Sequence, residues 1–206
     1  THMGHSEKVL LMRLFLTLLI IIFNLQSLTK ADDIKDFEIE GISIGDSLLD
    51  HFSKKEIKEN TMSNYYKNNK YTSVEFSDDG RFNIYESVEI NYLTKDNNYT
   101  IESVSGAIFC AKNFSKCKDL EKKIKSDISE QFKNLENFDY EGSHNADKSG
   151  DSKLSHNIFS YTNGDMIIIE TIDWSKKITQ KNGWTDNTSL SVRTNNFNEF
   201  LGIAFK

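Results

Sequence analysis

The stretch Leu154–Trp174, LSHNIFSYTNGDMIIIETIDW, decides the fold, because it holds two strand-like runs joined by a tight turn. Asn163-Gly164 is a dipeptide favoured by two-residue hairpin turns, in which both central residues take positive φ. The run Met166–Ile169 is apolar at every position, which indicates a strand covered on both faces. We therefore predict an antiparallel hairpin whose second strand, Met166–Trp174, lies inside a sheet.

The residues before this hairpin have first the period of strands and then that of a helix. Between Tyr71 and Cys110 apolar and polar side chains alternate around two turns, which predicts three or four antiparallel strands. Within them, Gly106 marks a bulge or a close contact. From Phe114 to Leu135 apolar residues recur every three or four positions, which predicts an amphipathic helix.

Two further helices are expected near the ends of the domain. Ser53 and Glu56 form a capping box for a short helix that should end near Asn60, and Asn196 is expected to cap a C-terminal helix. The remaining segments are expected to be a polar, mobile loop at 142–152, a long loop at 175–187 and a last strand around 190–192.

These elements predict the α+β class, with an antiparallel sheet of about six to seven strands in two meanders and helices packed on one face. Helical starts at Asp46 and near Lys116 leave open an αβββ pseudo-repeat. Residues 32–206 are expected to form a single domain, with 37–110 and 111–206 as its two halves.

Residues 1–31 have the layout of a secretory signal peptide. Met12-Arg13 precedes the apolar run Leu14–Phe23, and small residues before Ala31 provide a cleavage site. The apolar run is shorter than the roughly 20 residues that span a bilayer, so we favour cleavage after Ala31 over a retained anchor. Residues 1–11 precede the plausible start Met12 and are interpreted as a cloning remnant. The predicted location is therefore periplasmic or secreted.

The net charge of the chain argues against nucleic acid as its partner. The whole chain has 25 Lys+Arg, 31 Asp+Glu and a formal net charge of −6. Residues 1–31 contain three of those basic residues and one acidic residue, so cleavage would leave a net charge of −8 on residues 32–206. An acidic chain is not expected to bind nucleic acid, and after cleavage no stable membrane span is expected. The absence of proline from 206 residues excludes proline-rich and collagen-like classes.

The two cysteines, Cys110 and Cys117, are expected to form a disulfide, because an exported chain meets an oxidising compartment. The alternative is two buried free thiols. Their spacing fits neither a zinc site nor a Cys-x-x-Cys redox pair.

No catalytic, metal-binding or cofactor-binding residues are predicted. The three histidines after residue 31 are His51, His144 and His156, and no Gly-x-Ser-x-Gly motif accompanies them. Counted from Asp147, a calcium loop requires Gly at the sixth position and Glu at the twelfth, which here are Ser152 and Ile158, so we interpret Asp147–Asp151 as a solvated turn. Two tryptophans bracket a basic loop and form a candidate recognition surface; the alternative is tryptophans packed under that loop. This surface comprises Trp174, Lys176, Lys177, Lys181 and Trp184.

A resemblance adds to this interpretation. Residues 37–49, FEIEGISIGDSLL, resemble the opening of small secreted proteins from A/T-rich marine alphaproteobacteria of the Pelagibacter type. Cys117 at a helix start, Asp147–Gly150 and Asp173-Trp174 are similar to features of the same family. The resemblance implies a periplasmic protein in a family with no established activity, so it supplies no catalytic residues. Gly41–Gly45 before a helix pair and a meander is also similar, at fold level alone, to small envelope proteins of the outer-membrane assembly and β-lactamase-inhibitor type, which are non-enzymatic binding modules.

The sequence thus predicts a secreted, soluble periplasmic α+β protein that acts as a non-catalytic binding module for another envelope protein or a small ligand. The alternative is an envelope hydrolase whose site is assembled from scattered residues. That alternative predicts a deep pocket in which His51 or His156 meets two carboxylates. A third option is a membrane-tethered subunit that keeps its apolar N-terminus.

Overall fold

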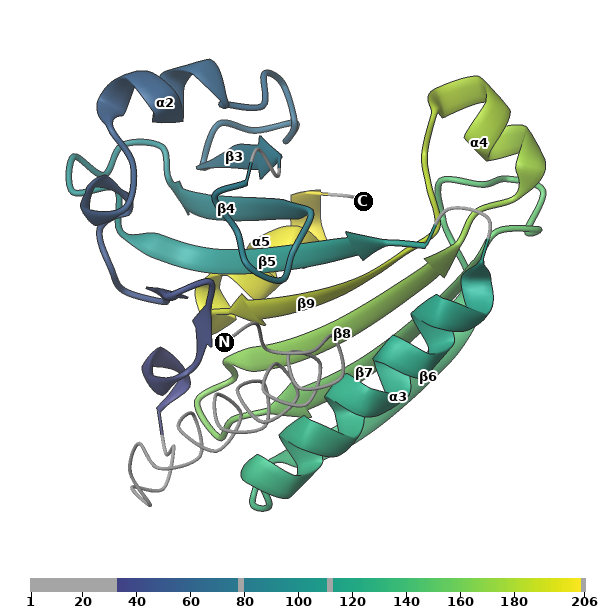
Figure 1. Ribbon diagram of the computed structural model, residues 1–206. Coiled ribbons are helices and arrows are strands. Elements are labelled where there is room, and N and C mark those ends of the chain that lie inside the picture. Colours follow the sequence, from purple (N-terminus) through teal and green to yellow (C-terminus); the bar gives the residue numbers. More distant parts are fainter. Residues whose placement is uncertain (1–32, 78–79, 111–112, 205–206) are drawn as a thin grey trace, which may run out of the picture. The chain divides into compact units, whose positions relative to one another are not determined.

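A seven-stranded antiparallel sheet organises the computed structural model, which describes residues 33–77, 80–110 and 113–204 (Figure 1). The predicted signal peptide lies outside the described residues. The strands run in the order β3-β4-β5-β9-β8-β7-β6, and two short strands, β1 and β2, form a separate hairpin. The bounds are β1 Glu38–Ile39, β2 Ile42–Ser43, β3 Tyr71–Ser77, β4 Ser87–Leu93, β5 Ile101–Phe109, β6 Glu136–Ser143, β7 Lys153–Ser160, β8 Met166–Asp173 and β9 Asn187–Arg193.

The sheet consists of two meanders, β3-β4-β5 and β6-β7-β8-β9, which confirms the predicted fold class. They join where β5 pairs with β9, with Val104 opposite Val192, so the sheet is continuous across the two predicted halves. The hairpin predicted at Asn163-Gly164 connects β7 to β8, and β8 is an interior strand as its apolar run indicated.

The helices are α2 Lys54–Glu59, α3 Phe114–Gln131, α4 Lys176–Asn182 and α5 Asn195–Ala204, with the 3-10 turns η1 Ile34–Asp36 and η2 Leu48–Asp50. The capping box of Ser53 and Glu56 is present, and α2 ends at the predicted position. None of the helices in the described part of the chain is long and apolar enough to cross a membrane.

One sheet face carries the apolar core. α3 packs on this face against β8 and β9, and Phe52 stacks on Phe76 of β3 with ring centroids 3.8 Å apart. Gly106 lies on the same face, where a Cβ would come closer than 3.0 Å to the Tyr85 ring, so the predicted close contact is present. The alternating residues Val74, Val88, Ile90, Val104, Ile167, Ile169 and Val192 are fully buried on this face.

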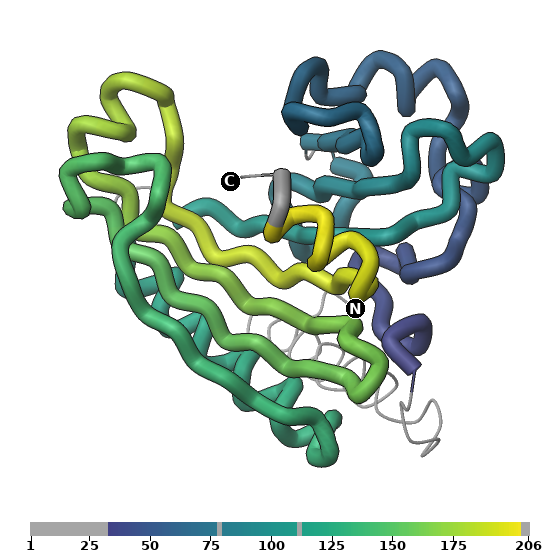
Figure 2. Tube along the Cα trace, turned by 180° about the vertical axis from the view of Figure 1, so that it is seen from behind, coloured from purple at the N-terminus to yellow at the C-terminus, as the bar shows by residue number. Residues whose placement is uncertain are grey.

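The sequence predicted that all helices would cover one face of the sheet. The structure differs, because α5 lies on the opposite face (Figure 2). Phe197 and Phe200 of α5 meet Tyr71, which the strand alternation places on the face away from Val74. Because α5 follows directly from the end of β9, its two phenylalanines reach only one end of the sheet. The rest of the second face lacks a covering helix among the described residues.

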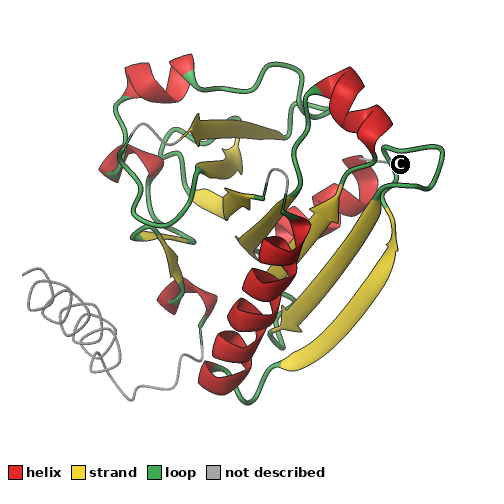
Figure 3. Cartoon of the chain, turned by 45° about the vertical axis from the view of Figure 1, so that its right-hand side comes forward, coloured by secondary structure: helices red, strands yellow, loops and turns green. Residues whose placement is uncertain are grey.

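Three local predictions were wrong. Two of them concern where helices and strands occur, which Figure 3 shows by colour. Part of the expected loop 175–187 is helix α4, which Ser175 caps at its start and Gly183 ends in a left-handed conformation. The helix before β6 ends at Gln131, short of the predicted Leu135, and after a turn the chain forms strand β6, which has no buried residue and so no apolar alternation. The side-chain cap of α5 comes from Thr194, whose Oγ1 accepts from the Phe197 amide, instead of Asn196.

Candidate functional site

The sheet face opposite α3 is polar at its centre. Because strand side chains alternate, the residues between the core positions all point to this second face. The pairing register sets them in rows: Glu75, Glu89, Ser105 and Ser191 are successive neighbours from β3 to β9. We call this side of the sheet the serine face, and define its polar centre as Ser73, Ser87, Ser103, Ser105, Ser189, Ser191, Glu75, Glu89, Asn91, Glu170 and Arg193. Within this set Ser73, Ser87, Asn91, Ser103 and Ser191 are buried, and the others are at least partly exposed.

Glu89 is the most heavily hydrogen-bonded carboxylate of the serine face. It accepts from Ser73 Oγ at 2.9 Å, Asn91 Nδ2 at 3.1 Å and Tyr65 Oη at 3.3 Å. Burial raises the pKa of Glu89, and the neighbouring Glu75 carboxylate raises it further, whereas these hydrogen bonds and Arg193 act in the opposite direction. All three partners are donors, so they fit an ionised carboxylate.

Arg193 lies on the central strand β9 and directs its guanidinium toward Ser191. Nη2 donates to Ser191 Oγ at 3.3 Å, and Ser191 Oγ in turn donates to Ser105 Oγ at 2.9 Å. Within the described ranges no carboxylate lies within 4.0 Å of this guanidinium, although its charge acts on both Glu89 and Glu170. The arrangement leaves guanidinium N–H groups that can still donate to a ligand.

Glu170 of β8 is hydrogen-bonded to Nε2 of His156 on the neighbouring strand β7. Burial alone would raise the pKa of Glu170, but the His156 hydrogen bond and the positive charge of Arg193 outweigh it and hold the pKa below its usual value. Oε2 is the oxygen that meets His156. Neither the other oxygen, Oε1, nor the hydroxyl of Ser189 opposite it has a hydrogen-bond partner among the described residues.

Exposed aromatic side chains surround this polar centre. Within the described part of the chain, five of the six exposed large hydrophobic side chains lie on or beside the serine face. Phe138 (63% exposed) and Tyr140 (45%) are on β6, in register with Ile158 and His156. The other three are Tyr65 beside Glu89, Phe109 at the end of β5, and Trp184, which follows α4 and contacts Trp174.

The structure brings the predicted recognition residues together at one end of this face. Trp174 follows β8 and lies between His144 and Trp184, with ring centroids 4.4 and 4.6 Å apart respectively. Trp174 is half-buried, whereas Trp184 is exposed, as are the three lysines of α4: Lys176, Lys177 and Lys181. Their role in recognition stays a prediction.

The segment Asp147–Asp151 is a turn whose residues Lys148, Ser149 and Asp151 are exposed, but Asp147 itself is buried and contacts the start of α4. Its carboxylate is buried and accepts hydrogen bonds from Ser152, Ser149 and Ser175, the last being the N-cap of α4. These donors, Ser152 first, hold the pKa of Asp147 well below its usual value. Hydrogen bonds from the local serines and backbone amides thus stabilise the negative charge of the Asp147 carboxylate, as a bound cation would in a calcium loop.

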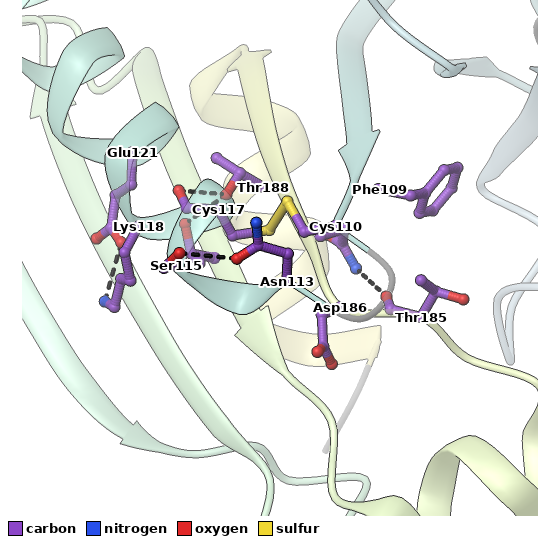
Figure 4. The surroundings of a disulfide bond; sticks show 12 residues. Phe109, Cys110, Asn113, Ser115, Cys117, Lys118, Glu121, Thr185, Asp186 and Thr188 are labelled. Carbon is purple, nitrogen blue, oxygen red and sulfur yellow. Dashed lines mark hydrogen bonds and ion pairs between the residues drawn. A yellow bond between two sulfur atoms is a disulfide. The ribbon is translucent and has the colours of Figure 1, made fainter.

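The predicted disulfide between Cys110 and Cys117 is present and joins the end of β5 to the first turn of α3 (Figure 4). Both cysteines are buried, and their Cα atoms are 5.8 Å apart. The amide of Cys110 donates to the carbonyl of Asp186, whose carboxylate accepts from the Trp174 amide at 2.8 Å. The bridge therefore supports the end of the serine face where the two tryptophans lie.

A hollow of about 700 Å³ on another part of the molecule brings His51 together with several carboxylates. Two of the carboxylates that line it already have structural roles. Glu40 accepts from the backbone amides of Asn83, Ile84 and Tyr85, and Glu56 completes the capping box of α2. Within the described residues no three His, Cys, Asp or Glu side chains are placed to hold a metal ion.

Sequence analysis missed the centre of the serine face, although a signal was present. Serine recurs every second residue in β5 and β9, at Ser103, Ser105, Ser189 and Ser191, and Arg193 continues the same alternation. Comparisons of the chain with protein-family models, curated proteins and solved structures found no match.

Proposed function

We propose that this protein is an exported, non-catalytic binding module whose binding surface is the serine face. The observation that carries the proposal is a polar sheet centre, with hydrogen-bonding groups still available, surrounded by exposed aromatic side chains. Large exposed aromatics beside a polar centre are typical of interaction sites. Tyrosine, tryptophan and arginine are enriched at protein interfaces, and serine joins tyrosine in antibody-type recognition loops.

The partner is another envelope protein or a small ligand. Export is supported by the Cys110–Cys117 disulfide, since such bonds persist in oxidising compartments. The net charge of −8 for residues 32–206 argues against nucleic acid.

The order of side chains across the strands favours binding over serine-based catalysis. In a catalytic triad the histidine lies between the serine and the acid. Here Glu170 on β8 lies between His156 on β7 and Ser189 on β9, so the serine neighbours the acid. Because Glu170 separates His156 from Ser189 across the strands, His156 is not next to the serine that it would have to activate.

Besides the hollow that gathers His51 with carboxylates, one observation favours the alternative, an envelope hydrolase. Glu75 and Glu89 face each other in register on β3 and β4, and the pKa of Glu89 is raised by burial while Glu75 lies beside it. A pair of carboxyl groups on either side of the scissile bond is what glycoside hydrolysis uses. Turnover of a glycoside probe by the wild type, abolished in Glu89→Gln, would replace the binding proposal.

Native mass spectrometry of protein released gently from the host envelope tests the binding proposal. We expect the wild type to carry an additional mass, a ligand or a partner, that Phe138→Ser/Tyr140→Ser loses. The matched control is Ile84→Ser, which removes an exposed apolar side chain (67% exposed) from the loop before β4. The same mass on both variants, or no bound mass on the wild type, would contradict the proposal.

A further inference from the structure

The central strands β8 and β9 place one cation and one anion of the serine face near each other without pairing them. Arg193 is four residues beyond Ser189 on β9, and Ser189 is directly opposite Glu170 on β8. The hydrogen bond from Nη2 to Ser191 Oγ places the guanidinium beside Ser191, two residues before Arg193 along β9. This is about 7 Å closer to Glu170 than the Arg193 backbone, measured along the strand. Neighbouring strands lie about 4.8 Å apart, so the two charged groups are close but outside ion-pair distance.

Hydroxyl groups line the interval between these two charges. Ser191 Oγ lies under the guanidinium, and Ser189 lies beside Glu170 with no hydrogen-bond partner among the described residues. Ile168, in register with Ser191, is the apolar neighbour on β8. The four polar groups therefore form one short line: guanidinium, two hydroxyls and carboxylate.

We propose that this line is a subsite for a small zwitterion, an α-amino acid or a short peptide end, whose carboxylate is bound by Arg193 and whose ammonium group is bound by Glu170 Oε1. The proposal rests on the serine face being a binding surface and specifies the chemistry of its ligand. A guanidinium offers paired N–H donors that match a carboxylate. Glu170 Oε1 is an acceptor that the His156 hydrogen bond leaves available.

The balance of charge selects a zwitterion over a simple ion. A ligand that is only anionic would meet Arg193, but also the carboxylates of Glu75, Glu89 and Glu170 on the same face. A ligand that is only cationic would meet the guanidinium at the centre. A ligand with both charges, separated by the length of an amino acid, satisfies each group and keeps like charges apart.

Isothermal titration calorimetry with each common L-amino acid tests the subsite. We expect at least one to bind, and its N-acetyl form and its carboxamide form, which each lack one charge, to bind at least about tenfold more weakly. Arg193→Gln and Glu170→Gln should each weaken binding by a similar factor. Arg193→Lys should recover part of the affinity, because it keeps the charge and loses the paired geometry.

Glu136→Gln is the matched control, because it removes one exposed carboxylate from β6, at the far edge of the same face. It should leave the affinity unchanged. The comparison of charged and blocked ligands uses wild-type protein and does not depend on how any variant folds.

Two results would overturn the subsite: no amino acid binds the wild type, or the blocked forms bind as well as the zwitterion. If the wild type nevertheless carries a bound mass that Phe138→Ser/Tyr140→Ser loses, the serine face remains the binding surface and only the zwitterion is wrong. If the variant pair and Ile84→Ser carry the same mass, the proposed function itself fails.

Discussion

Removing the disulfide is the perturbation whose magnitude the structure fixes best. Cys110 and Cys117 are seven positions apart, so the bridge closes a loop of eight residues counting both ends. In the chain-entropy model a loop of that length contributes about 2.5 kcal/mol to the free energy of unfolding. For a domain of this size, each kcal/mol corresponds to about 2–4 °C in Tm, so the loss is about 5–10 °C.

The effect should also be local. The Cys110 amide donates to the Asp186 carbonyl, and the Asp186 carboxylate accepts from the Trp174 amide. Trp174 and Trp184 are the two tryptophans of the chain, so intrinsic fluorescence reports on this end of the serine face alone. We expect Cys110→Ser/Cys117→Ser to change that fluorescence before global unfolding begins.

Urea unfolding of wild type and of Cys110→Ser/Cys117→Ser, monitored by circular dichroism and by fluorescence, measures both effects. Intact mass before and after reduction of the wild type establishes that the bridge has formed. Equal unfolding free energies for an oxidised wild type and the variant would refute the loop-closure reasoning. Coincident circular dichroism and fluorescence transitions in the variant would refute the local effect.

Three further perturbations test the packing that supports the serine face. Glu121→Ala should lower the free energy of unfolding by about 3 kcal/mol, because it leaves the buried Ser155 hydroxyl without its 2.8 Å acceptor and removes a buried ion-paired charge. Chemical denaturation measures this loss. A loss under 1 kcal/mol, as at an ordinary surface site, would contradict the prediction. Gly106→Ala should lower the free energy of unfolding by about 1–3 kcal/mol, because the new Cβ meets the Tyr85 ring. Adding Tyr85→Leu in the same chain should recover part of this stability in a thermal melt. An unchanged melting temperature for Gly106→Ala would contradict the steric argument. Folding lowers the pKa of Asp147. The carboxylate therefore contributes its full stabilisation above the usual pKa of 3.8, and this stabilisation is lost as the pH falls toward the lower folded pKa. In an acid titration the free energy of unfolding should fall more steeply with decreasing pH for wild type than for Asp147→Asn, and parallel curves would contradict this.

The sheet was predictable because its signals are local. Asn163-Gly164 specifies a turn, and the apolar run Met166–Ile169 specifies an interior strand, so the β7-β8 hairpin follows from residues adjacent in sequence. The capping box of Ser53 and Glu56 is equally local. Cys110 and Cys117 are close in the chain, and one bridge is the only pairing that two cysteines allow.

The serine face was not predictable at the same level, because it depends on which strands become neighbours. Arg193 and Glu170 lie together only because β9 pairs with β8, and Glu89 is surrounded by polar groups from β3 and a preceding loop. Strand β6 was missed for a related reason: both its faces are exposed, so Phe138 and Tyr140 do not alternate with buried positions.

The central claim, that ligands bind on the serine face, is tested most directly by mapping amide chemical shifts of the isotope-labelled protein with the molecule recovered from the wild type. The account predicts that the largest changes fall on the strands of this face, at Ser105, Ser189 and Ser191, and at the indole of Trp184. Changes gathered instead around His51 and Glu40, in the hollow away from this face, would contradict it.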